Sequence, residues 1–194
     1  MLQTINLDNH FEQLTQVGWT TLAINPLWAQ DLGKAAGERQ KKRQFHTAAL
    51  ARTSNLEIRN DETFWLDAKL ADLELIEHEA LSGLESLKQQ LRDFFRIHIA
   101  EIECHYSYYE PGHFYLRHQD ATGVNNQRIF SFVIYLNVDW QPKDQGQLIG
   151  YHQDEILFSI LPKMGTMIIF RSEIEHEVRP GNRNRWALTG WFRK

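Results

Sequence analysis

The chain has a single cysteine, Cys104, among its 194 residues, so no internal disulfide can form. It contains no apolar run of the roughly 18 residues that suggest a membrane-spanning helix. Its first residues, Met1-Leu2-Gln3-Thr4-Ile5, show no basic region followed by an apolar one, which is the pattern of a secretory signal. These absences exclude a disulfide framework and predict a cytoplasmic protein with no membrane partner.

Positive charge is not in excess either. The chain has 21 Lys and Arg against 25 Asp and Glu, a formal net charge of −4. A weakly acidic chain lacks the broad positive field that sequence-independent phosphate binding requires, so nucleic acid is a disfavoured partner and a nucleic-acid demethylase a weak hypothesis.

Internal repeats, low-complexity tracts and linkers are absent from the sequence too. With 42% hydrophobic residues, we expect one domain over residues 1–194.

The two halves of the chain differ in periodicity. Residues 1–98 show helical patterns, which we interpret as a helical support together with a substrate-entrance segment. The charged run Glu38–Arg43 is interpreted as a solvated helix end. The predicted helices are Leu7–Val17 before Gly18, a second from Asn25-Pro26 to about Gln40, and Leu81–Phe95 with an apolar stripe.

Residues 99–194 carry short β-branched and aromatic runs separated by turn residues. Eight antiparallel strands of this kind predict a double-stranded β-helix, or jelly roll. The fold class is therefore mainly β with supporting N-terminal helices (α+β). The predicted strands are 99–109, 113–118, 127–137, 147–151, 155–160, 166–170, 175–179 and 185–192.

Two histidines and one carboxylate stand where they could converge on one metal ion. His118 and Asp120 are two residues apart in a β-prone stretch, and such residues project from the same strand face. His176 is the natural third ligand from elsewhere in the chain. Three such ligands on one side of an octahedron leave the opposite positions open, as in non-haem Fe(II) oxygenases. A zinc hydrolase or metal-storage site is the weaker alternative.

A second His-Gln-Asp triplet, His152 to Asp154, repeats the first letter for letter. It lies where a hairpin turn is expected, between the apolar runs 147–151 and 156–161. It is also much closer to His176 in sequence, which leaves too little chain for the strands that would bring two opposed barrel strands face to face. We therefore favour His118 and Asp120 as the ligands.

Much of the chain resembles a known family. The residues that carry the resemblance are Tyr109-Glu110-Pro111-Gly112, Tyr115 to Asp120, Arg128, Ile134 to Asn137, Trp140, Pro162, Gly165, His176-Glu177-Val178, Arg185 to Trp191 and, upstream, Ile58 to Asp61 with Trp65. Their order and spacing resemble the 2-oxoglutarate and Fe(II)-dependent oxygenases, in the prolyl 4-hydroxylase-like branch. The upstream segment is similar to the animal oxygen-sensing prolyl hydroxylases and their bacterial relatives.

The resemblance implies Fe(II) bound by His118, Asp120 and His176, with 2-oxoglutarate and O2 converted to succinate and CO2. Arg185 would hold the far carboxylate of 2-oxoglutarate in a bidentate fork, with Arg183 as the competing candidate. Tyr109, Tyr135, Thr189 and Trp191 would line the co-substrate pocket, although packing in the core is an alternative for each. Arg59 and Asp61 would shape the substrate entrance, or else form an ordinary exposed ion pair.

The resemblance further implies a protein substrate bearing a proline, from a regulatory or translation-machinery protein, with substrate choice in residues 45–65. A free amino acid or another side chain is the alternative substrate. From a different class, a catalytically silent barrel that binds a partner or senses metal is also considered. Iron-dependent succinate production separates that barrel from an enzyme. The sequence does not indicate an oligomeric state.

Overall fold

The computed structural model describes residues 1–2, 6–48, 58–122 and 127–194. Its helices are α1 (Asp8–Val17), α2 (Pro26–Lys41) and α3 (Leu75–Phe95), with a short 3-10 helix η1 (Pro142–Asp144). Its strands are β1 (Trp19–Ala23), β2 (His46–Thr47), β3 (Glu62–Leu66), β4 (Glu101–Tyr109), β5 (Tyr115–His118), β6 (Arg128–Tyr135), β7 (Leu148–His152), β8 (Glu155–Ile160), β9 (Thr166–Arg171), β10 (Glu175–Val178) and β11 (Arg185–Arg193).

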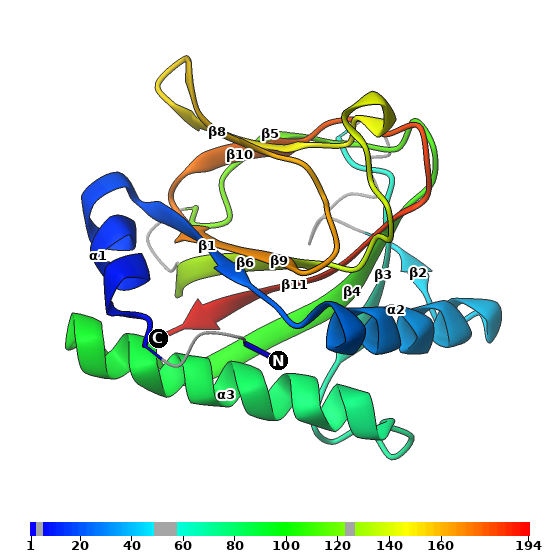
Figure 1. The fold of residues 1–194 in the computed structure, drawn as a ribbon, viewed down its shortest axis with the longest axis horizontal. Helices are drawn as coiled ribbons and strands as arrows, with labels where there is room; N and C mark the ends of the chain where they lie inside the picture. The colour runs from blue at the N-terminus through cyan, green and yellow to red at the C-terminus, as the bar shows by residue number, and fades with distance from the viewer. Residues whose placement is uncertain (3–5, 49–57, 123–126) are drawn as a thin grey trace.

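The strands form two antiparallel sheets that face each other (Figure 1). The larger sheet has the order β1-β9-β6-β11-β4-β3-β2, and the smaller has the order β5-β10-β7-β8. Helix α3 runs along the side of the larger sheet that faces away from the smaller one (Figure 1). Its buried leucines, at positions 84, 87 and 91, pack into the main apolar core. None of the described helices is long and apolar enough to cross a membrane.

The jelly roll predicted for residues 99–194 is confirmed. Each of the eight strands from β4 to β11 begins and ends within two residues of its predicted bounds. Short β-branched and aromatic runs separated by clear turn residues gave these strands distinct boundaries. The two layers that they form enclose the site described below.

Residues 1–98 do more than support the barrel, which corrects the interpretation of this half as helical. Strand β1 pairs with β9 at one end of the larger sheet, and β3 pairs with β4 toward the other. In the sequence β1 lies between the helices α1 and α2, and β3 precedes α3, so no neighbouring run of strands marked them as part of the sheet. Helix α3 also begins at Leu75 rather than Leu81, because a capping box at Glu74 and Glu77 starts it earlier.

The charged run Glu38–Arg43 is not wholly solvated, contrary to expectation. Arg39 turns inward and is only 3% exposed. Its Nε and Nη2 atoms each donate to a carboxylate oxygen of Glu77 at 2.6 Å, and Glu77 is fully buried. The Tyr106 hydroxyl donates to the same carboxylate at 3.2 Å. This ion pair therefore joins α2, α3 and β4 through one buried contact.

Candidate active site

A cavity of about 690 Å³ lies between the two sheets. The inward-facing residues of β4, β6 and β11 form its floor, and residues of β5 and β10 form its roof. Inward-facing residues alternate along each strand, so the side chains that line the cavity follow a period of two. The cavity collects most of the residues predicted for the site.

Three of these residues form a candidate metal centre. His118 and His176 face each other across the β5–β10 pair. The Nε2 atom of His118 lies 3.7 Å from Oδ1 of Asp120, and that of His176 lies 3.5 Å from Oδ2. One ligand atom from each of the three residues lies within 4.8 Å of the other two. This arrangement is the two-histidine, one-carboxylate set that suits non-haem iron.

Backbone carbonyls fix the orientation of both imidazoles. Nδ1 of His118 donates to the Leu116 carbonyl at 2.7 Å, and Nδ1 of His176 donates to the Ile174 carbonyl at 2.9 Å. A carbonyl oxygen only accepts hydrogen bonds, so each Nδ1 carries the proton in the neutral ring. Each Nε2 therefore presents a lone pair toward the shared space, as metal binding requires.

The charge states of the triad also suit a cation. Burial alone would raise the pKa of Asp120, but the two histidines and the Ser131 hydroxyl hold that pKa well below its usual range. Burial lowers the pKa of His176 to about 4, with the Asp120 carboxylate opposing the shift. At neutral pH the carboxylate is thus ionised and His176 is neutral, so no proton needs to leave either side chain before a metal binds.

Asp120 is positioned by two serines that the sequence did not single out. The Ser131 hydroxyl donates to Asp120 Oδ2 at 2.7 Å, and Ser172 lies 2.9 Å from the same hydroxyl. Because Ser131 uses its proton on the carboxylate, Ser172 is the donor in the second contact. Alternation along the predicted strand 127–137 could have placed Ser131 inside the barrel, but not beside Asp120.

Arg185 occupies the interior of the cavity at the start of β11. It is 2% exposed, and its guanidinium lies over the rings of Tyr109 and Tyr135 at 5.0 and 5.3 Å. Its Nε donates to the Gly146 carbonyl at 3.2 Å, whereas one Nη is buried with no partner among the described residues. A buried guanidinium without an acid is a place for an anion.

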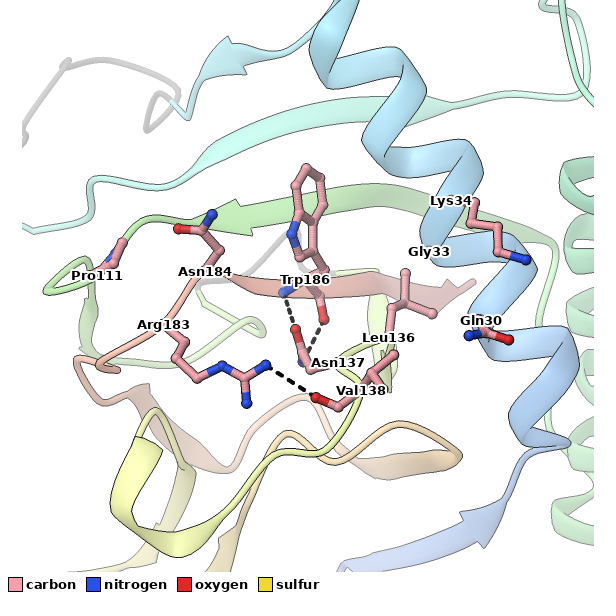
Figure 2. A pocket seen from close by; sticks show the side chains of 10 residues that line it. All are labelled: Gln30, Gly33, Lys34, Pro111, Leu136, Asn137, Val138, Arg183, Asn184 and Trp186. Carbon is pink, nitrogen blue, oxygen red and sulfur yellow. Dashed lines mark hydrogen bonds between the residues drawn. The ribbon is translucent and has the colours of Figure 1, made fainter.

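Arg183, the competing arginine, lies outside this cavity. Figure 2 shows it in a separate cleft beside α2, where it donates to the Val138 carbonyl. It also pairs with Asp144 at 3.1 Å and is partly exposed. The turn predicted for residues 182–184 separates it from β11, so it does not share the inward face that Arg185 occupies.

Tyr109 and Tyr135 both contact Arg185, but they differ in position. Tyr109 lines the cavity, and burial raises its pKa well above the ordinary value. Tyr135 is fully buried and is not among the residues that line the cavity, and its hydroxyl lacks a hydrogen-bond partner among the described residues. Burial raises its pKa to about 12, so the phenol stays protonated and can donate a hydrogen bond.

Thr189 and Trp191 share the inward face of β11 with Arg185 and line the cavity. Thr189 accepts a hydrogen bond from the Ser107 hydroxyl at 3.1 Å. Trp191 pairs in register with Ser131 and therefore lies near Asp120 rather than near Arg185. Trp191 lies six residues after Arg185, which corresponds to about 20 Å of extended strand. Arg185 and Trp191 therefore mark opposite ends of the cavity.

Arg59 and Asp61 form a buried ion pair rather than an exposed one. Arg59 donates from Nε and Nη2 to the two Asp61 oxygens, each at 2.7 Å, and Asp61 is fully buried. The guanidinium also stacks over the Tyr115 ring at 4.3 Å and lines the cavity. Of the predicted substrate-choice segment 45–65, residues 49–57 lie outside the described residues.

The second His-Gln-Asp triplet lies in the β7–β8 hairpin, as expected. His152 is exposed at the end of β7, and Gln153 adopts a positive φ of 56° in the turn. Neither His152 nor Asp154 lines the cavity. His105 and Ser107 do line it, and sequence reasoning missed both, although alternation back from Tyr109 along β4 would have found them.

Comparisons with known proteins agree with this geometry. Residues 104–193 match the family model described as the 2OG-Fe(II) oxygenase superfamily. A prolyl-4-hydroxylase structure from Pseudomonas putida is 30% identical, covers 97% of this chain and 99% of its own, and has a TM-score of 0.88. A Trichoplax adhaerens prolyl hydroxylase, solved with a peptide fragment of hypoxia inducible factor, is 25% identical over 96% of this chain and 89% of its own, with a TM-score of 0.81.

Curated relatives include Egl nine homolog 1 of mouse and human, each 28% identical over 149 residues. The match covers 72% of this chain but only 36% and 34% of those proteins, so the chain spans about a third of their length. The fold, the triad and these likenesses share one explanation. The chain belongs to the 2-oxoglutarate and Fe(II)-dependent oxygenase superfamily, in its prolyl 4-hydroxylase-like branch.

Proposed function

We propose that this protein is an Fe(II) and 2-oxoglutarate-dependent oxygenase that hydroxylates prolyl residues of a protein substrate. The observation that carries the proposal is one cavity with a metal-binding triad in its wall and, at its end, a buried arginine with one Nη that has no partner among the described residues. A metal alone would need only the triad. The arginine adds a fixed site for an anion that can reach the metal at the same time.

The triad fits Fe(II). His118 and His176 would each bind through Nε2, and Asp120 through a carboxylate oxygen. Two imidazoles and one carboxylate, with no thiolate near them, suit iron better than a structural zinc site, which is usually closed by four protein ligands. The open side of the triad faces the cavity, where a co-substrate and dioxygen have room.

The other end of the cavity fits the far carboxylate of 2-oxoglutarate. Within the described residues, one Nη of Arg185 and the nearby hydroxyl of Tyr135 have no hydrogen-bond partner. A carboxylate has acceptor sites for both donors, and the surrounding rings exclude water, which strengthens the contact. When bound, iron, 2-oxoglutarate and O2 supply the oxidation, which yields succinate, CO2 and a hydroxylated carbon.

A prolyl protein substrate is supported by the relatives' names. The similar structures are described as prolyl hydroxylases, and one was solved with a peptide fragment of a protein. His46 and Trp65, on β2 and β3, line the cavity and are exposed, so the cavity reaches the surface beside these strands, where a peptide can approach. We extend the same proposal to a regulatory or translation-machinery protein as the source of the substrate, and to a cytoplasmic location.

The first test is hydroxylation itself. We expect the protein, loaded with Fe(II) and 2-oxoglutarate, to add one oxygen atom to proline in a set of proline-centred peptides, with succinate formed in equal amount. Isotopically heavy dioxygen should label the product, as read by mass spectrometry of the peptide fragments. Labelled product on a free amino acid or on another side chain would overturn the prolyl assignment, and absence of iron-dependent succinate would overturn the oxygenase.

Arg185→Ala provides a second test. We expect the concentration of 2-oxoglutarate at half-maximal succinate formation to rise about 10- to 100-fold, since a hydrogen bond to a charged group is worth about 1.5–3 kcal/mol. Arg183→Ala is the matched control, because Arg183 lies outside the cavity. It should leave the 2-oxoglutarate requirement unchanged. Equal effects of the two changes would argue against an anchor at Arg185.

A further inference from the structure

An aromatic wall stands at the end of the cavity opposite Arg185. It consists of Trp65, His105 and Trp191, on β3, β4 and β11. The His105 ring lies 4.8 Å from the Trp65 ring and 5.4 Å from the Trp191 ring, and all three residues line the cavity. Trp65 is 52% exposed, so the wall runs from the protein surface to the neighbourhood of the metal-binding carboxylate.

Two polar atoms in this wall lack partners. His105 is 3% exposed, and its Nδ1 is buried without a hydrogen bond to any described residue. The indole Nε1 of Trp191 is buried and equally unpaired within the described chain. Buried polar groups are rarely left in this state in folded proteins, so two of them side by side in a cavity point to a ligand that completes them.

The chemistry of these two groups is mainly that of donors. An indole nitrogen only donates. Burial, with the charges of Arg59 and Arg128, lowers the pKa of His105 to about 3, so the imidazole is neutral and has one N–H to give. A carbonyl-rich ligand therefore fits this wall better than a ligand rich in N–H groups.

A prolyl residue within a chain is such a ligand. Proline has no backbone N–H, so its main-chain hydrogen bonds are all accepted by carbonyl oxygens, its own and that of the preceding residue. Its ring is apolar and packs well on aromatic surfaces, as in other proline-recognition grooves. The position of the wall near Asp120, away from the anion site at Arg185, is where a target side chain has to enter.

We infer that His105 is a specificity-determining residue, which donates a hydrogen bond to a main-chain carbonyl of the substrate beside the target proline. This inference rests on the proposed function. It assigns His105 to substrate binding and to neither the metal nor 2-oxoglutarate. A purely packing role predicts that any flat ring at this position would serve as well.

The test compares His105→Phe with His105→Gln. Phenylalanine keeps a flat ring between the tryptophans but has no donor, whereas glutamine keeps an N–H in a flexible side chain. We expect His105→Phe to raise KM for a proline-centred peptide about tenfold, the size of one lost hydrogen bond, and to raise succinate formed per hydroxylated peptide. Titration with Fe(II) and 2-oxoglutarate should match wild type, and glutamine should recover most of the loss in KM.

His113→Phe is the matched control, because His113 also has a buried, unpaired Nδ1 within the described residues but does not line the cavity. It should leave KM unchanged. A His105→Phe enzyme with wild-type KM, or one that loses the Fe(II) and 2-oxoglutarate complex, would overturn the inference. If the wild-type protein forms succinate but hydroxylates no prolyl peptide, both the proposed substrate and this inference are overturned. If the wild-type protein hydroxylates the peptide and His105→Phe has the same KM, only this inference is overturned.

Discussion

His118→Ala is expected to abolish the weak visible charge-transfer band that Fe(II) and 2-oxoglutarate give together in the absence of oxygen, and to reduce hydroxylation at least about 10³-fold. The metal supplies several kcal/mol of stabilisation to the reaction, and each 1.36 kcal/mol is a factor of ten. Without His118 only Asp120 and His176 remain of the cluster. Two ligands hold iron too weakly and leave its orientation undefined.

His152→Ala is the matched control for this experiment. It removes the histidine of an identical His-Gln-Asp triplet, but one that is exposed in the β7–β8 hairpin and outside the cavity. It should retain both the band and the activity. A band that persists in His118→Ala, or one that disappears in His152→Ala, would show that the metal is bound elsewhere. Circular dichroism of both variants separates loss of the metal from loss of the fold.

Glu77→Gln is expected to lower the free energy of unfolding by about 3 kcal/mol. Breaking a buried ion pair from one side costs about 3–5 kcal/mol, because the remaining charge is left without compensation. Arg39 keeps a contact to Asp72 at 3.2 Å, and Asp72 is exposed, so we place the loss at the lower end. The total stability of a domain is only about 5–15 kcal/mol, so this is a large fraction.

Urea denaturation at neutral pH measures this effect. The midpoint should fall while the slope stays constant, as expected when stability changes and the two states do not. Glu38→Gln, which breaks the exposed pair of Glu38 with Lys41 in the same charged run, should leave the midpoint unchanged. Equal midpoints for Glu77→Gln and wild type would mean that the buried pair contributes no net stability.

The barrel strands were predictable because their signal is local. Short β-branched and aromatic runs bounded by turn residues define each strand from β4 to β11 without knowledge of its partners. Strands β1 and β3 were not predictable, because each stands next to helices in the sequence and its place in the sheet depends on pairing with β9 and β4. The burial of Arg39 could not be predicted either. The charged sequence at the end of its helix does not indicate that Arg39 will pair with a buried carboxylate on another helix.

The residues of the candidate site were likewise predictable only in part. Residue type and spacing were enough to single out His118, Asp120 and His176, whereas the family resemblance added Arg185. The sequence also offered a second triplet and a second arginine as weaker candidates. In the structure, strand pairing sets His118 opposite His176, whereas His152 lies at the exposed end of β7.

By itself the sequence determined the chemistry available to this protein: a jelly roll, a set of metal ligands and a cation for a dicarboxylate. These are properties of residue type and local period. Only the tertiary structure decided which polar atoms have no partner among the described residues, such as one Nη of Arg185, the hydroxyl of Tyr135 and Nδ1 of His105. Whether a polar atom finds a partner depends on contacts between strands far apart in the chain, and these follow from packing the two sheets face to face.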